Sequence, residues 1–184
     1  MELLDILDEE GNPTGKVADR RIVHEKGLWH RHVGVWIMNS KGEILLQKRA
    51  KSKKVNPNKW TITGGHTDAG EDVIEGIQRE TAEEIGVIIP NEKFELIKIE
   101  KLERLIPNTN IITRNYSYLY FVLVDYSLTD YTMQKEEVSD LKYITIEEME
   151  EARRNKDESY NFTKWDTERF DEIVKWLKKR REKI

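Results

Sequence analysis

The chain contains no cysteine, so disulfide bridges, catalytic thiols and zinc sites built from thiolates are all excluded. No internal repeat, low-complexity segment or linker rich in proline, glycine and serine interrupts its 184 residues. That length suits one domain with a sizeable core. We therefore expect a single domain over residues 1–184 and a cytoplasmic location.

Long apolar runs are absent as well, because no stretch approaches the roughly 20 residues that cross a bilayer. The first ten residues, MELLDILDEE, are acidic where a secretory signal would be basic and then apolar. The chain also lacks a basic excess, since its formal net charge is -4. We expect neither a membrane nor a nucleic-acid duplex among its partners.

Strand-like and helix-like segments are interspersed along the chain. Strands are expected at residues 2–7, 31–38, 43–49, 60–63, 93–102, 116–126 and 141–144. Helices are expected at residues 18–27, 71–85 and 146–155, and an amphipathic one includes residues 170–177. A capping box of Thr145 and Glu148 opens the third of these helices. This order predicts an α/β or α+β fold of helices packed on a sheet.

The stretch GGHTDAGEDVIEGIQRETAEEIG, residues 64–86, gathers seven carboxylates around one positive charge, Arg79. A helix turns by about 100° per residue, so Glu80, Glu83 and Glu84 share one face and Arg79 can reach Glu83. Carboxylates held so close raise one another's pKa or recruit a cation. Mg²⁺ and Mn²⁺ prefer such oxygen ligands, and the alternative is an acidic face solvated by water.

Glycine positions favour the cation site over the solvated face. Gly64 and Gly65 are expected to form a turn before the helix, where backbone carbonyls can approach a cation closely. Gly76 lies inside the expected helix, where glycine costs about 1 kcal/mol relative to alanine. That cost makes sense if the helix packs tightly against a loop.

The type and spacing of several residues resemble the Nudix box of the Nudix hydrolase family: Gly65, Glu71, Arg79, Glu80, Glu83, Glu84, Gly86 and Val87. Thr81 departs from the pattern, because the family usually has a bulky apolar residue there. The resemblance implies an α/β/α sandwich with a mixed β-sheet and a loop-helix-loop catalytic motif. Its core would span about residues 30–150, with an N-terminal hairpin and helix and the C-terminal amphipathic helix added.

The same resemblance implies roles for individual residues and a divalent cofactor, Mg²⁺ or Mn²⁺. The metal ligands would be three glutamates, Glu80, Glu83 and Glu84, assisted by a backbone carbonyl near Gly64 or Gly65. Arg79 would orient a carboxylate within the catalytic set, bracing the motif rather than touching substrate. The residues that shape the motif itself would be Gly65, Glu71 and Gly86.

The proton acceptor is left open between Glu83 and Glu137, with Glu136 as a neighbouring alternative. An acidic residue before a valine in this region often serves as metal ligand or base in similar proteins. The basic segment LLQKRAKSKK lies just upstream of the box and offers cationic contacts for phosphate. We expect Arg49 and Lys53 to bind the substrate.

Three of the four histidines lie in HEKGLWHRH, and His66 enters the box. The surrounding sequence is similar to isopentenyl-diphosphate isomerase, a Nudix relative in which two upstream histidines and one near the box hold a metal. His24, His30 and His66 fall at comparable places. Packing and hydrogen bonding in the strand are the alternative, which we prefer for His30 and His32.

Two features of the isomerase are missing from the chain. Gly64 takes the place of the cysteine that assists protonation, and the downstream strand, within NIITRNYSYLYFV, carries no acidic residue. The carboxylate helix of the hydrolases is complete. We therefore predict a hydrolase of an isomerase-like Nudix subgroup.

The leading hypothesis is metal-dependent hydrolysis of a diphosphate linkage in a nucleoside di- or triphosphate or a nucleotide derivative. The alternatives are isopentenyl-diphosphate isomerisation and a non-catalytic nucleotide-binding module. The partner would be a small-molecule diphosphate, whose identity depends on loops near residues 103–117 and 127–140. The oligomeric state stays open, although homodimers are common among similar proteins and the C-terminal helix could supply a contact.

Overall fold

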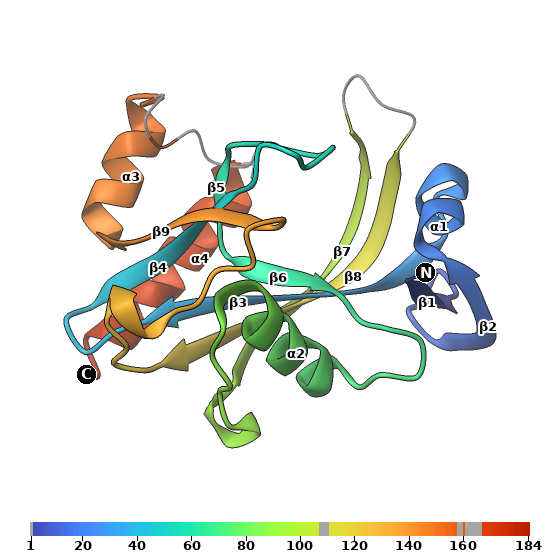
Figure 1. Cartoon of the computed structure of the whole chain (residues 1–184), viewed down its shortest axis with the longest axis horizontal. Coiled ribbons are helices and arrows are strands. Elements are labelled where there is room, and N and C mark those ends of the chain that lie inside the picture. Colours follow the sequence, from blue (N-terminus) through green and yellow to red (C-terminus); the bar gives the residue numbers. More distant parts are fainter. Residues whose placement is uncertain (1, 107–110, 158–159, 161–166) are drawn as a thin grey trace. The chain divides into compact units, whose positions relative to one another are not determined.

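The computed structural model describes residues 2–106, 111–157, 160 and 167–184. Strands and helices are mixed along the chain (Figure 1). The nine strands formed by the described residues are hydrogen-bonded in one large mixed sheet. Two compact units share the chain. The first comprises Met1–Val35, Thr63–Glu83 and Ile88–Val122, and the second comprises Trp36–Ile62, Glu84–Val87 and Leu123–Ile184.

The first unit begins with an antiparallel strand pair and a short helix. Strands β1 (Leu3–Leu7) and β2 (Pro13–Asp19) pair in register from Leu3 with Asp19, and α1 (Arg20–Lys26) follows directly. The Asp19 side chain accepts the Arg21 N–H at the start of α1, and Gly27 ends it in the left-handed conformation. These are the usual N-terminal and C-terminal helix signals.

Strand β6 (Thr63–His66) contradicts the expected glycine turn before the long helix. It pairs antiparallel with β3 (Trp29–Met38), with Gly64 opposite Gly34 and Gly65 opposite Val33. A Cβ atom on Gly64 would lie 2.2 Å from the Val33 carbonyl oxygen. The glycines therefore serve a close approach of two strands, and the loop that precedes the helix spans residues 67–72.

Helix α2 (Val73–Ile85) begins two residues later than expected, because Asp72 accepts the Ile74 N–H and caps it. A 3₁₀ turn (Asn91–Lys93) then leads to β7 (Glu95–Leu105), which forms a long antiparallel hairpin with β8 (Ile112–Leu123) (Figure 1). Both strands were expected, with different bounds. Part of the expected specificity loop, residues 107–110, lies outside the described residues.

The second unit contains β4 (Glu43–Arg49), β5 (Trp60–Thr61) and β9 (Val138–Thr145), with β4 paired to both others. A 3₁₀ turn (Leu128–Asp130) precedes β9. The capping box expected at Thr145 and Glu148 is present and opens α3 (Ile146–Arg154). Helix α4 (Thr167–Arg181) buries the apolar stripe expected from its sequence: Phe170, Ile173, Val174 and Leu177.

The expected fold class is confirmed, since the described residues form four α-helices and a large mixed sheet. Among those residues, no helix combines the length and apolar character that a bilayer-spanning segment needs. The single-domain organisation over residues 1–184 stays a prediction.

Candidate active site

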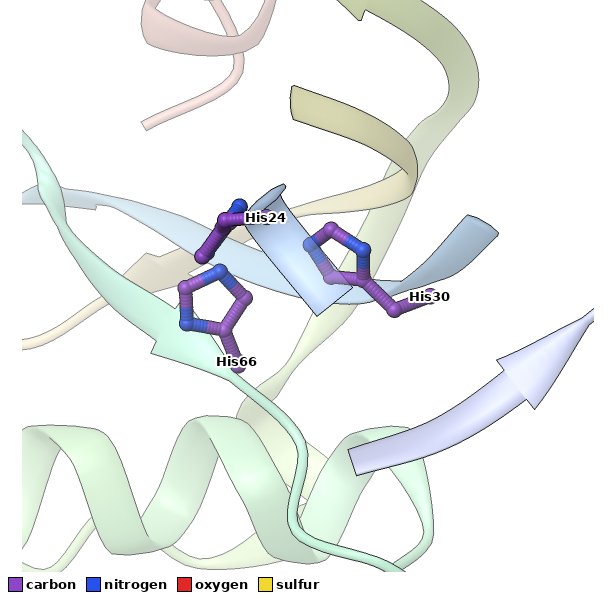
Figure 2. A group of neighbouring side chains, drawn as sticks. All are labelled: His24, His30 and His66. Atoms are coloured by element: carbon purple, nitrogen blue, oxygen red, sulfur yellow. The ribbon is translucent and has the colours of Figure 1, made fainter. Parts of the chain in front are cut away.

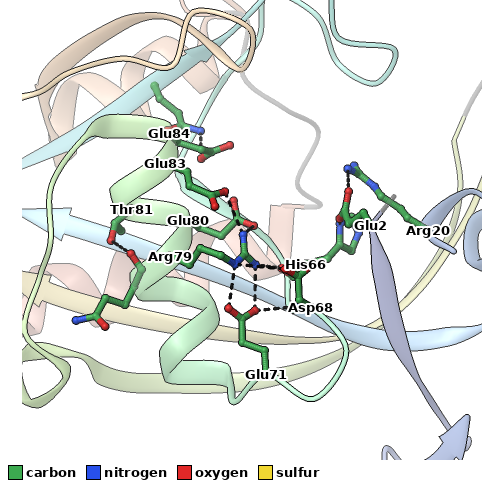
Figure 3. A network of polar contacts seen from close by, with 12 residues as sticks. Glu2, Arg20, His66, Asp68, Glu71, Arg79, Glu80, Thr81, Glu83 and Glu84 are labelled. Carbon is green, nitrogen blue, oxygen red and sulfur yellow. Dashed lines mark hydrogen bonds and ion pairs between the residues drawn. The ribbon is translucent and has the colours of Figure 1, made fainter. Parts of the chain in front are cut away.

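Arg79 is the centre of a polar network on α2 (Figure 3). Its guanidinium donates to both oxygens of Glu71, from Nε to Oε1 at 2.9 Å and from Nη2 to Oε2 at 3.0 Å. Its Nη1 atom donates to Glu80 Oε1 at 3.0 Å and to Glu83 Oε2 at 3.2 Å. Burial opposes the charge of Arg79, but these carboxylates outweigh burial and raise its pKa. Arg79 therefore stays charged and holds two of the expected metal ligands together.

The two ligands around Arg79 differ in their access to solvent. The Glu80 side chain is 13% exposed, whereas that of Glu83 is 52% exposed. A Cβ atom on Gly65 would lie 2.4 Å from Glu80 Oε1, so the β6 backbone closely approaches this carboxylate. The absence of a side chain at Gly65 thus lets the β6 backbone lie close to Glu80, as it must if the Gly65 carbonyl and Glu80 are to bind the same metal ion.

Gly76 has the packing role that its position in the helix indicated. A Cβ atom there would lie 2.8 Å from Thr67 Cγ2 and 3.1 Å from Glu71 Oε2. The helix therefore packs tightly against the loop that carries Glu71. Thr81, the departure from the Nudix pattern, is buried, and its hydroxyl donates to the Gln78 carbonyl at 2.9 Å.

Glu84 belongs to the second unit and is buried. Gln47 of β4 donates from Nε2 to Glu84 Oε2 at 2.7 Å, and Gln134 donates its backbone N–H to the Glu84 carbonyl at 3.0 Å. Gly86 adopts φ 75°, and a Cβ atom there would meet Thr132 at 2.7 Å. Sequence reasoning missed Gln47, although a polar residue within the apolar run EILLQKR is a signal that could have identified it.

The structure pairs two residues that were expected to have separate roles. Lys53 Nζ donates to Glu137 Oε1 at 2.5 Å, and the Ala50 N–H donates to the Glu137 carbonyl at 2.8 Å. Arg49, the last residue of β4, donates from Nε to the Val55 carbonyl at 3.1 Å, in the segment that follows the strand. Ser52 Oγ donates to the backbone carbonyl of Glu136. Of the two neighbouring acids, Glu137 therefore has its carboxylate fixed by Lys53 of the basic segment.

A second cluster, formed by three histidines, lies in the first unit (Figure 2). His24 comes from α1, His30 from β3 and His66 from β6. One possible ligand atom from each histidine lies within 4.8 Å of the other two. Among the described residues, these three side chains form the group whose histidine or carboxylate ligand atoms are close enough to share a metal ion. The alternative left open for these histidines, metal binding, thus has a geometric basis. His32 instead hydrogen-bonds Ser117 Oγ at 3.2 Å.

The donor atoms of this cluster fit a metal ion. His30 donates from Nδ1 to the Leu28 carbonyl at 2.9 Å, which leaves Nε2 as a lone pair. The Ile112 backbone opposes the lowering of the His24 pKa by burial. His30 Nε2 and His24 Nδ1 are buried and have no hydrogen-bond partner among the described residues. Buried polar atoms are normally satisfied, so two orphaned nitrogens that lie this close together indicate a ligand.

The protonation states agree with that fit. Burial lowers the pKa of His30 to about 4, and burial also lowers the pKa of His24 and His66. Imidazole binds a metal in its neutral form. All three rings are therefore neutral near pH 7, ready to act as ligands.

Comparisons with known proteins find similar sequences among Nudix hydrolases and isopentenyl-diphosphate isomerases. Nudix hydrolase 3 of Arabidopsis thaliana is 36% identical over 163 residues, covering 86% of this chain and 21% of that protein. This chain therefore spans about a fifth of the length of that relative. Isopentenyl-diphosphate Delta-isomerase 2 of Photorhabdus laumondii is 29% identical and covers 96% of this chain and 92% of its own length.

A solved structure shares the fold, and a family model matches most of the chain. The crystal structure of DR0079 from Deinococcus radiodurans superposes with a TM-score of 0.66 at 20% identity, covering 97% of this chain and 98% of that one. The NUDIX domain model matches residues 28–166. This range includes β3, β6 and the whole of α2. The chain belongs to the NUDIX domain family.

Proposed function

We propose that the protein is a metal-dependent hydrolase that cleaves a diphosphate linkage in a nucleoside di- or triphosphate or a nucleotide derivative. The observation that carries this proposal is the Arg79 network, in which one cation holds Glu80 and Glu83 on successive turns of α2. A structural helix has no need for such an arrangement, because like charges this close repel each other. Membership of the Nudix family supports the same chemistry.

Glu80, Glu83 and Glu84 are the proposed ligands of Mg²⁺ or Mn²⁺, assisted by the Gly65 carbonyl. A bound divalent ion would neutralise the diphosphate and make a water molecule more acidic. Arg79 keeps the carboxylates oriented. Arg49 and Lys53 are the proposed substrate contacts, because both belong to the basic segment LLQKRAKSKK.

Two carboxylates are candidates for the base that accepts the proton from water. Glu83 is half exposed, so water can reach it. Glu137 is held in place by the Lys53 ammonium, which donates to its carboxylate. Both remain proposals, and substitution of each by glutamine separates them.

Isomerisation of an isopentenyl diphosphate is the second candidate, favoured by the histidine cluster and by the Photorhabdus relative. Two observations oppose it. A side chain at Gly64 would collide with the Val33 carbonyl, so no protonating cysteine fits there. Strand β8, ITRNYSYLYFVL, carries no acid. We propose that the cluster binds a divalent cation within a hydrolase. A non-catalytic nucleotide-binding module is the third candidate.

The test is incubation with nucleotides, nucleotide sugars and isopentenyl diphosphate in the presence of Mg²⁺. We expect phosphate or nucleoside monophosphate to be released, and we expect Glu83→Gln to reduce the rate about 100-fold or more. Glu92→Gln, at an exposed carboxylate of the same unit, is the matched control. Allylic product from isopentenyl diphosphate would establish the second candidate. Nucleotide binding without turnover would establish the third.

A further inference from the structure

Glu2, just before β1, connects the N-terminal segment to the histidine cluster (Figure 3). Its Oε1 atom lies 3.5 Å from His66 Nδ1, and its Oε2 atom accepts from Arg20 Nη1 at 2.7 Å. The Arg20 backbone N–H also donates to the Glu2 carbonyl at 2.9 Å. Glu2 is thus fixed at both its main chain and its carboxylate, and each carboxylate oxygen faces a different partner.

The contact determines which nitrogen of His66 can bind a cation. A carboxylate can only accept, so His66 Nδ1 carries the proton and Nε2 has the free lone pair. Figure 2 shows the His66 ring turned toward His24 and His30, and the His30 and His66 ring centroids are 5.0 Å apart. The carboxylate therefore selects the tautomer in which His66 can contribute a lone pair to the cluster.

Each of the three histidine rings has a partner outside the cluster. His30 donates to the Leu28 carbonyl, His66 faces Glu2, and the Ile112 backbone acts on His24 by opposing the lowering of its pKa. Partners outside the cluster orient metal-binding histidines and increase their basicity. Glu2 is the partner that carries a full negative charge.

We propose that Glu2, held by Arg20, is a positioning residue for a cation bound by His24, His30 and His66. This inference rests on the proposed cation-binding role of the cluster and assigns the N-terminal segment a part in it. Three neutral imidazoles form a donor set suited to Zn²⁺ or Co²⁺, whereas Mg²⁺ prefers oxygen ligands. The cluster is therefore expected to bind a cation of a different class from the carboxylates of α2.

A purely structural role for Glu2 makes a different prediction. If Glu2 only tied the N-terminus to α1 through Arg20, its replacement would lower stability and leave cation affinity unchanged. If Glu2 positions His66, replacement lowers affinity even in a folded protein. Loss of an outer carboxylate of this kind typically weakens metal binding by about 10- to 100-fold.

The experiment titrates the metal-free full-length protein with Co²⁺ and follows its visible absorption, with Mg²⁺ present throughout. We compare wild type with Glu2→Gln, which keeps the shape of the side chain and removes its charge, and with Glu10→Gln, an exposed N-terminal carboxylate, as control. His66→Asn tests whether the signal comes from the cluster. Thermal unfolding of the metal-free proteins is measured in parallel.

We expect Glu2→Gln to weaken Co²⁺ binding by roughly 10- to 100-fold with little change in metal-free unfolding temperature, while Glu10→Gln matches wild type. Affinity of Glu2→Gln within twofold of wild type would overturn the role of Glu2 alone. Absence of Co²⁺ uptake by wild type, or uptake unaffected by His66→Asn, would overturn the cluster as a cation site. Mg²⁺-dependent hydrolysis, assayed separately with Glu83→Gln, reports on the proposed function independently.

Discussion

Arg79 and Glu71 form a two-point ion pair, with both carboxylate oxygens within 3.0 Å of the guanidinium. Glu71 lies in the loop before α2 and also accepts the Asp68 N–H at 2.8 Å. The pair therefore fixes the loop to the helix that carries the proposed metal ligands. The Glu71 side chain is only 14% exposed, so water cannot readily replace its contacts.

Replacing Glu71 with alanine should destabilise this part of the protein. The change removes a charge-assisted bidentate pair and leaves the guanidinium partly buried, so we expect the free energy of unfolding to fall by about 2 kcal/mol. Urea denaturation measures the effect, with Glu92→Ala as the exposed control. Equal stability of the two variants would show that Arg79 does not depend on Glu71.

Replacement by alanine should have different effects at Gly65 and at Gly64. At Gly65 the new methyl group would meet the end of the Glu80 side chain, which can move, whereas at Gly64 it would meet the Val33 backbone, which cannot. We expect Gly65→Ala to fold and to lose activity by up to about 100-fold through a displaced carboxylate. Gly64→Ala should lose stability. Circular dichroism melting and kcat compare the two, and full activity of Gly65→Ala would contradict the close approach of Glu80.

A rescue experiment can test Gly76. Alanine improves helix propensity by about 1 kcal/mol, but its Cβ would lie 2.8 Å from Thr67 Cγ2. We expect Gly76→Ala alone to lower the free energy of unfolding by about 1–2 kcal/mol, because the site is already full. Thr67→Ser removes the obstructing methyl group, so the double variant should recover most of the loss. Urea melts of the four proteins form a cycle, and additive effects would rule out the contact. The larger Gly76→Leu change should also impair metal affinity.

The features that the sequence predicted well depend on short spacing. The position of Glu80 and Glu83 beside Arg79, the capping box at Thr145 and the close packing at Gly76 all follow from residues within a few turns of one another. Helix periodicity determines such neighbours without knowledge of the rest of the fold.

Contacts between distant segments could not be derived in this way. Gln47 meets Glu84, Glu2 meets His66 and Lys53 meets Glu137 across long stretches of chain. Strand pairing and the contact of a helix end with a strand create these neighbours, and neither is apparent in any one segment. The Gly64 error has the same origin, because a glycine needed for close strand approach has the same local sequence as a glycine in a turn.

The Lys53–Glu137 pair should behave as a unit in kinetics. If Glu137 is the base, Glu137→Gln should reduce kcat by about 100-fold or more. Lys53→Met should reduce kcat/KM by a smaller factor than Glu137→Gln does, because the Glu137 carboxylate remains. The two losses should not add, with a coupling free energy of about 0.5–3 kcal/mol. Steady-state kinetics of both single variants and the double variant measure the coupling. Additive effects would show that the two side chains act separately, and unchanged kcat in Glu137→Gln would leave Glu83 as the base.

Arg181 and Glu147 connect the C-terminal helix α4 to α3 through two hydrogen bonds of 2.7 and 2.8 Å. Hydrogen bonds from Arg181 outweigh a small burial effect and lower the pKa of Glu147 to about 2 from 4.5. The folded pKa is therefore below the unfolded one. The stabilisation is complete above pH 4.5 and is lost as the pH falls through about 2. Because the Glu147 side chain is 56% exposed, solvent screening limits the effect to about 0.5–1 kcal/mol.

The consequence is a difference between variants that depends on pH. Arg181→Gln should lower the free energy of unfolding by about 0.5–1 kcal/mol at pH 6 and by progressively less as the pH falls toward 2. Lys179→Gln, in the same helical turn but exposed, removes an equal charge without this partner and controls for net charge. Urea unfolding across the pH range separates the two. A deficit for Arg181→Gln that stayed constant down to pH 2 would assign its role to packing of the arginine side chain against Gly42, a contact that does not titrate.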